Sequence, residues 1–192
     1  DRRLKKIMNR RLFLGYKIPR KIIDTIVMAR TTLGDNQKFY NWVSGNNLHL
    51  TLLFLGSTDL VDDEKLCSDI NTVISEYEDF SISINGTGVF GNENQILWLG
   101  VDRGKEKLQE INYELQVQLA EALKKTTKSK FMPHITIARK KKTEINNNID
   151  VKNFMNSVYF PIEFHINFFT LFESRNINGR VHYKRIDKFN LI

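Results

Sequence analysis

The chain alternates between short stretches in which apolar residues occupy every second position and longer ones in which they recur every three or four positions. The first spacing places alternate side chains on one face of a strand, and the second places them on one stripe of a helix. Strands are therefore predicted at residues 11–16, 48–55, 80–84, 95–101, 131–138, 160–172 and 181–189, with an extended segment at 38–43. Helices are predicted from Pro19 to about Gly34, at 59–79 and at about 104–125.

The order of these elements indicates the fold class. Strands outnumber helices and the two do not alternate strictly, which is typical of an α+β chain. A chain of 192 residues fits one ordinary domain or two small lobes packed together, and we expect a single domain over residues 8–192. Residues 1–7 are basic and lack the apolar core of an export signal, so we interpret them as an N-terminal extension.

Composition adds the picture of a soluble protein. Hydrophobic residues make up 41% of the chain and charged residues 27%, which is the balance of a globular domain. No apolar run approaches the roughly 20 residues that a membrane helix needs. The single cysteine, Cys67, excludes an internal disulfide. We therefore expect a cytoplasmic monomer without a membrane partner.

The charge of the chain favours an anionic partner. Lysine and arginine number 29 against 22 aspartate and glutamate residues, a net charge of +7. A basic surface raises the encounter rate with polyanions, so nucleic acid or a phosphorylated ligand is a natural partner. Many soluble proteins carry a similar excess, so the charge alone leaves both interpretations open.

The pattern His-x-Thr occurs twice, at His49 with Thr51 and at His134 with Thr136, each time inside a predicted strand with apolar neighbours. Residues two apart on a strand share a face, so each strand presents one imidazole and one hydroxyl on the same side. The two histidines are 85 residues apart, close to half the chain. An internal duplication would give this spacing, with two similar lobes facing each other across a cleft.

These groups suit the opening of a cyclic phosphodiester. That reaction needs a base to deprotonate water and an acid to protonate the leaving alkoxide, and imidazole, with a pKa near ~6.5, can do either. The hydroxyls of Thr51 and Thr136 can donate hydrogen bonds to the non-bridging oxygens. Arg139, three residues after Thr136, can add a charge-assisted contact to the phosphate.

Other features of the sequence favour plainer interpretations. A single histidine on a strand is usually a structural or surface residue, and we expect this of His165 and His182, which lack a threonine two residues later. The four histidines and one cysteine have no spacing typical of a metal site, so neither a metal nor another cofactor is expected. Glycines 86, 88 and 91 lack the surroundings of a phosphate loop and predict a hairpin turn.

Seven segments in chain order carry a resemblance to a known family. They are Arg11–Phe13, Asn47–Leu52, Phe54–Gly56, Gly88–Phe90, Leu97–Gly100, Pro133–Arg139 and Phe169–Ser174. From about Arg11 to Ile186 the chain resembles the RNA 2′,3′-cyclic phosphodiesterases of the 2H phosphoesterase superfamily, historically named 2′-5′ RNA ligases. The resemblance implies a bilobal α+β fold in which two pseudo-twofold-related antiparallel sheets line a central cleft, with helices outside.

The resemblance also implies metal-independent hydrolysis of a terminal 2′,3′-cyclic phosphate to a 2′-phosphate. His49 would be the proton donor to the departing O3′ and His134 the proton acceptor from water, whereas the local sequence leaves these two roles open. Thr51 and Thr136 would bind the phosphate, with Arg139 assisting. Phe13 has two interpretations: it lines the cleft, as the family pattern suggests, or it packs in the core.

Several alternatives for the substrate stay open. The same histidines could serve 2′-5′-linked oligonucleotides or small cyclic nucleotides, with 2′-5′ joining as the reverse reaction, or the chain could be a non-catalytic RNA-binding module. Lysines near the second motif are candidates for guiding an RNA backbone, or belong to a solvated basic loop: Lys124, Lys125, Lys128, Lys130 and residues 140–142. Tyr40, Trp42 and Trp98 can stack on bases, although Trp98 in an apolar strand suits the core.

Overall fold

The computed structural model describes residues 10–58, 63–123, 130–144, 147–157 and 159–192. Its strands are β1 (Arg10–Lys17), β2 (Tyr40–Trp42), β3 (His49–Thr58), β4 (Phe80–Phe90), β5 (Ile96–Val101), β6 (His134–Lys140), β7 (Ile162–Ile166), β8 (Phe168–Ile177) and β9 (Arg180–Asn190). Its α-helices are α1 (Ile23–Thr31), α2 (Asp63–Ile74), α3 (Lys105–Gln118), α4 (Ala120–Leu123) and α5 (Lys152–Met155). The 3-10 turns are η1 (Arg20–Ile22), η2 (Gly34–Phe39), η3 (Gly45–Asn47) and η4 (Lys142–Glu144).

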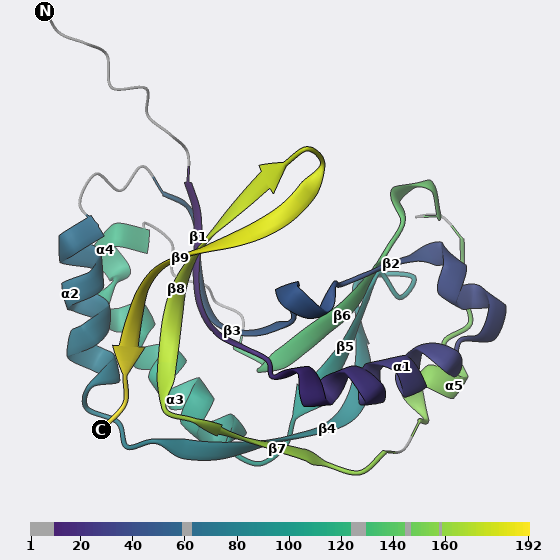
Figure 1. Cartoon of the computed structure of the whole chain (residues 1–192), viewed down its shortest axis with the longest axis horizontal. Coiled ribbons are helices and arrows are strands. Elements are labelled where there is room, and N and C mark those ends of the chain that lie inside the picture. Colours follow the sequence, from purple (N-terminus) through teal and green to yellow (C-terminus); the bar gives the residue numbers. More distant parts are fainter. Residues whose placement is uncertain (1–9, 59–62, 124–129, 145–146, 158) are drawn as a thin grey trace, which may run out of the picture.

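The strands pair in the order β7-β4-β5-β6-β3-β1-β8-β9, with β2 also on β6, and every pairing is antiparallel. We call β3, β1, β8 and β9 the terminal half and β2, β6, β5, β4 and β7 the central half. The halves meet where β3 pairs β6 through one residue pair, Leu50 with Ile135. Figure 1 shows the two halves diverging from this seam. The α+β class is confirmed. The two antiparallel sheets expected from the resemblance correspond to the central half and the terminal half, which β6 and β3 join into one sheet.

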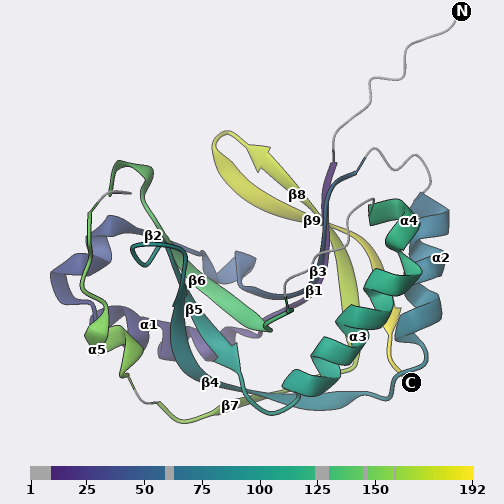
Figure 2. The ribbon, with the colours of Figure 1, turned by 180° about the vertical axis from the view of Figure 1, so that it is seen from behind.

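The helices lie on the outer sides of both halves. Helices α2, α3 and α4 pack against β9 and β3, and α5 packs against β4; Figure 2 shows α2, α3 and α4 grouped beside the terminal half and α1 and α5 beside the central half. The apolar residues that flank and separate the motif residues point toward this covered side, and they are fully buried: Leu50, Leu52, Ile135 and Ile137. Burying such a side chain is worth about 1.5–3 kcal/mol, so the strands can settle in only one orientation.

The opposite side of the seam carries the polar residues of the motifs. The residues that alternate with the buried ones are half-buried, and they are His49, Thr51, His134 and Thr136. We call this side of the sheet the histidine face. The alternation that the sequence predicts thus decides which side chains leave the core.

Two predictions about the strands are wrong in detail. The predicted strand 160–172 is two strands, β7 and β8, separated at Asn167; β7 pairs β4 in the central half and β8 pairs β1 and β9 in the terminal half. Gly86 and Gly88 lie inside β4, and the hairpin turn occupies residues 91–94. Gly86 has a φ of 85° at an irregularity in the β4–β5 register, a backbone that favours glycine.

The ends of the predicted elements also shift. Residues 34–39 form the turn η2, so the extended segment predicted at 38–43 shortens to β2. The predicted helix 59–79 corresponds to α2, and that at 104–125 to α3 and α4. Residues 1–7, the expected extension, lie outside the described residues. Over the part of the chain that the structure describes, no helix has the length and apolar character to cross a bilayer.

Candidate active site

The seam brings the two motifs into register. Leu50 of β3 faces Ile135 of β6 in an antiparallel pair. One residue along the two antiparallel strands in either direction from this pair, His49 stands opposite Thr136 and Thr51 stands opposite His134. Directly opposite residues on one face have Cβ atoms roughly 5 Å apart, and diagonal neighbours roughly 7–8 Å apart. All four polar side chains therefore gather around one point of the histidine face.

Each imidazole is held by the same backbone contact. Nδ1 of His49 lies 2.7 Å from the carbonyl oxygen of Asn47, and Nδ1 of His134 lies 2.7 Å from that of Met132. A carbonyl oxygen can only accept, so Nδ1 donates in both rings and the neutral form carries its free lone pair on Nε2. Nε2 is therefore the atom that can take up or release a proton in both copies.

Burial shifts both histidines in the same direction. Loss of solvation lowers the pKa of His49 and of His134, and the hydrogen bonds to Asn47 and Met132 offset this in part. The positive charge of Arg139 lowers the pKa of both histidines further, and a charge on His134 lowers the pKa of His49. The two rings and the guanidinium thus act on one another electrostatically, as groups around one anion site would.

A bulge decides the side on which Arg139 lies. Strict alternation from Thr136 would place residue 139 on the covered side. The β5–β6 register skips one residue of β6: Trp98 pairs with Thr136, and Leu97 pairs with Ala138, so Ile137 is extra. An inserted residue reverses the alternation beyond it. Arg139 consequently returns to the exposed side, in agreement with its effect on the two histidines.

The surroundings of His49 are aromatic. The Phe13 ring lies 4.8 Å from the His49 ring, and the Tyr183 ring meets it edge-on at 5.0 Å. Phe13 also stacks on Phe172 at 5.2 Å. Because Phe13 is only 3% exposed, it supports the imidazole from beneath, which agrees with the packing interpretation. Asn47, whose carbonyl orients His49, holds the β8–β9 hairpin through Nδ2 to the Val181 oxygen, 2.8 Å away.

His134 also has aromatic neighbours. Phe90 meets its ring edge-on at 4.8 Å, and Trp98 lies 6.1 Å away and stacks on Phe90 at 5.0 Å. The Trp98 ring lies over Gly88, where an added Cβ would come within 2.0 Å of it. Gly88 is therefore needed for close packing, and Trp98, which the sequence suggested for the core or for base stacking, packs at the site beside His134.

The two threonines complete the constellation. Both are half-buried, and neither hydroxyl has a hydrogen-bond partner among the residues that the structure describes. Hydroxyl groups on the same face as two proton-transfer atoms and one guanidinium can donate to the oxygens of a bound phosphate. The arrangement is chemically suited to general acid–base attack on a phosphodiester.

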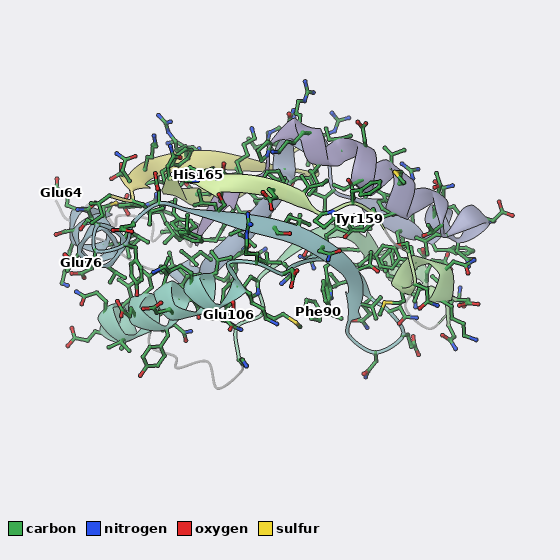
Figure 3. The ribbon with its side chains drawn as sticks, turned by 90° about the horizontal axis from the view of Figure 1, so that it is seen from below. Glu64, Glu76, Phe90, Glu106, Tyr159 and His165 are labelled. Carbon is green, nitrogen blue, oxygen red and sulfur yellow. The ribbon has the colours of Figure 1, made fainter. Side chains whose placement is uncertain are left out.

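The other histidines lie elsewhere. Nε2 of His165 lies 3.0 Å from Oδ2 of Asp79 on the surface, and Figure 3 shows His165 well away from Phe90, the ring that contacts His134. His182 is exposed on β9. Both positions agree with the surface role expected from sequence. Within the described ranges, no three His, Cys, Asp or Glu side chains gather as a metal site would require.

One lysine expected to guide RNA is unsuited to that role. The Lys140 side chain is 2% exposed, and its ammonium donates to the backbone oxygens of Glu93 and Asn147. The bulge at Ile137 explains this, because it turns residue 140 inward when it turns residue 139 outward. Lys130 and Lys142 are exposed. Lys124, Lys125 and Lys128 lie outside the described residues.

Some contact residues were missed by the sequence argument. Tyr183 and Phe90 contact the histidines, and Phe172 stacks on Phe13, but all three stand in strands far from the motifs in sequence. Phe90 and Phe172 do belong to segments that carry the family resemblance, which was the available signal. Tyr183 had no such signal, because its place depends on the pairing of β9 with β8.

Comparisons with known sequences and structures found relatives of this chain. Residues 18–178 match the model of the 2′-5′ RNA ligase superfamily. An RNA 2′,3′-cyclic phosphodiesterase of Bacillus subtilis (strain 168) is 30% identical over 132 residues, covering 67% of this chain and 70% of that protein. One from Thermotoga maritima is 33% identical over 102 residues, covering 52% and 54%. The structure of E. coli LigT in apo form shares the fold, with a TM-score of 0.68, 22% identity and coverage of 95% of this chain and 97% of that one.

Proposed function

Because the chain belongs to the 2′-5′ RNA ligase superfamily, we propose that it is an RNA 2′,3′-cyclic phosphodiesterase in which two histidines act as general acid and general base. The reaction opens the cyclic phosphate at an RNA end and leaves a 2′-phosphate. The name carried by relatives in Bacillus subtilis and Thermotoga maritima supports the substrate class.

The observation that carries the proposal is the matched pair of oriented imidazoles. Each ring donates Nδ1–H to a carbonyl two residues earlier, and each leaves Nε2 for chemistry. A binding module needs cations and hydroxyls for phosphate, but it has no use for two rings held in the same tautomer. The geometry therefore favours catalysis over binding alone.

The proton steps follow from the roles that the resemblance assigns. Nε2 of His134 accepts a proton from water as the water oxygen attacks phosphorus. The bond from phosphorus to O3′ breaks, and Nε2 of His49 donates its proton to that oxygen. The product carries a 2′-phosphate and a free 3′-hydroxyl, and proton exchange with solvent restores both rings.

The electrostatics of the site favour protonation of one ring at a time. A charge on His134 lowers the pKa of His49, so the state with both rings protonated is disfavoured. A bound phosphodiester carries one negative charge, which favours protonation of one ring. The site with substrate would then hold one imidazolium and one neutral imidazole, the state that acid–base cleavage requires.

The remaining groups stabilise charge. Negative charge builds on the non-bridging oxygens during attack, and preorganised donors aimed at those oxygens lower the barrier. Thr51 and Thr136 supply hydroxyls from opposite strands, and Arg139 supplies a permanent positive charge on the same face.

The direct test is hydrolysis of an RNA oligonucleotide that ends in a 2′,3′-cyclic phosphate. We expect a 2′-phosphate as the product, a bell-shaped pH profile and full activity in the presence of a chelator, because imidazoles alone supply the acid and the base. Formation of a 3′-phosphate would contradict the assigned leaving oxygen. If the protein hydrolyses only 2′-5′-linked dinucleotides or 3′,5′-cyclic nucleotides, the proposed substrate is wrong. If it binds RNA without hydrolysing it, the proposal of catalysis is wrong.

A further inference from the structure

The two motif strands share a bulge at the same place. In β6 the extra residue is Ile137, three after His134. In β3 the β1–β3 register pairs Gly15 with Thr51 and Leu14 with Leu53, so the extra residue is Leu52, three after His49. In both strands two buried residues follow the threonine and an exposed one comes next. Phe54 is thereby the counterpart of Arg139.

Phe54 lies on the histidine face. Its Cα pairs with that of Phe13 on β1, and Phe13 pairs in turn with Phe172 on β8. Directly opposite residues of paired strands point to the same side, and Phe13 contacts His49. The three phenylalanines thus form a row across three strands, in which Phe13 is 3% exposed and Phe54 is 54% exposed.

Arg11 accompanies the exposed ring. Its guanidinium carbon lies 5.9 Å from the centroid of the Phe54 ring. The preceding residue, Arg10, points to the other side of β1, where it pairs with Asp63 at 2.7 Å and with Glu173 at 3.6 Å. Arg11 is exposed, and no carboxylate of a described residue lies within ion-pair distance of it.

Arg11 and Arg139 act on the same part of the face. Both charges lower the pKa of Tyr183, against the larger raising effect of burial. The Tyr183 ring meets the His49 ring edge-on at 5.0 Å, so both cations act on the part of the histidine face around His49. Residue 54 is three residues beyond Thr51, roughly 10 Å along the strand, so its ring lies away from the phosphate site.

We propose that Phe54 and Arg11 form a subsite for the nucleotide that precedes the one carrying the cyclic phosphate. The inference rests on the proposed function and names its substrate class as an oligonucleotide. The base of that nucleotide stacks on Phe54, and Arg11 binds the phosphate that links the two nucleotides. An aromatic ring beside a cation is the usual means of holding a single strand without reading its sequence. A mononucleotide has no second phosphate for Arg11.

The test compares kcat/KM for uridine 2′,3′-cyclic phosphate with that for the dinucleotide UpU ending in a 2′,3′-cyclic phosphate. The native protein should prefer the dinucleotide at least ~10-fold, in line with the contribution of one stacked base. Phe54→Ala should reduce this ratio about 10-fold, and Phe54→Tyr should keep it. Phe160→Ala serves as the matched control, because Phe160 is 93% exposed and makes no ring contact with a described residue.

The arginine has its own readout. Arg11→Met should flatten the dependence of log affinity for the dinucleotide on log salt concentration by roughly 0.7, the value for one phosphate contact on a single strand. Arg11→Lys should keep most of the native slope. If the salt dependence of affinity in Arg11→Met equals that of the native protein, Arg11 does not bind the phosphate and is not part of the subsite.

The outcomes separate this inference from the proposed function. The subsite alone would be overturned if the native protein hydrolyses both substrates equally well. It would also be overturned if Phe54→Ala leaves the ratio of the two kcat/KM values at its native level. A native protein that hydrolyses neither substrate would overturn the proposed function. In that case calorimetric titration with UpU 3′-phosphate and uridine 3′-phosphate decides on the subsite, which requires tighter binding of the dinucleotide and loss of that advantage in Phe54→Ala.

Discussion

The strands that carry His49 and His134 have the same backbone design and different side-chain surroundings. Each holds Nδ1 on the carbonyl two residues earlier, and each has an extra residue after its threonine. Phe13 and Tyr183 of the terminal half contact His49, with Phe172 stacked on Phe13, whereas Phe90 and Trp98 of the central half contact His134. Beyond the bulge, one strand presents Phe54 and the other Arg139.

This difference teaches how two equivalent imidazoles can take unequal roles. The repeated backbone fixes the tautomer and the face, which both roles need. The diverged side chains set how far each ring is removed from water and which charges act on it. A permanent cation stands in one half only at this position, so the phosphate site is asymmetric although its frame is nearly symmetric.

The largest expected effect comes from removing either ring. His49→Ala and His134→Ala should each lower kcat by at least ~10²-fold, the usual contribution of a positioned acid or base. The double variant should lose far less than the product of the two, because the rings act as a unit. Single-turnover assays on the cyclic-phosphate RNA measure this. His165→Ala is the control. Native-like turnover in either single variant would contradict the proposal that both imidazoles are catalytic.

Removal of the one-sided cation should have the next largest effect. Arg139→Met should lower kcat/KM about 10- to 100-fold, as expected for loss of a charged hydrogen bond to phosphate. Because the charge of Arg139 lowers the pKa of both histidines, its removal should raise both. Both limbs of the pH profile of kcat/KM should then move to higher pH. If both limbs of the pH profile of this variant stay at their native pH, the charge of Arg139 does not act on the histidines.

The threonines test how symmetric the phosphate site is. Thr51→Val and Thr136→Val each remove one hydroxyl at nearly constant shape, and each should lower kcat about 10-fold. If the two strands contribute equally, steady-state kinetics should give similar losses. A loss confined to one variant would show that only one half holds the charged oxygens.

The smallest effects should come from the rings around each histidine, and they show which histidine titrates in which limb of the pH profile. Tyr183→Ala admits water to His49 and should raise its pKa toward ~6.5, because burial is the main cause of its lowering. Phe90→Ala should do the same for His134. Each variant should therefore move to higher pH the limb of the pH profile in which its own histidine titrates.

Histidine NMR titration of both variants assigns each shift to one ring. Tyr113→Ala, which changes an exposed aromatic residue of α3, should leave both pKa values at the native level. A native pKa of His49 in Tyr183→Ala, or of His134 in Phe90→Ala, would show that these rings do not keep water from the imidazoles.

The sequence determined the local half of this site. Strand alternation placed His49 and Thr51 on one side and Leu50 on the other, and the repeated motif did the same around Ile135, because the period of a strand is an intrinsic backbone property. The class of fold and the two candidate histidines follow from such patterns, and the seven matching segments extend the argument to most of the chain.

Only the tertiary structure decided what depends on neighbouring strands. A bulge is defined only by the register with a neighbouring strand. The alternation of the sequence alone therefore could not predict the exposure of Arg139 and Phe54 or the burial of Lys140. The split at Asn167 and the place of Tyr183 beside His49 likewise depend on which strands pair across long separations. Pairing partners and register are set by packing of the whole chain, and no local spacing carries that information.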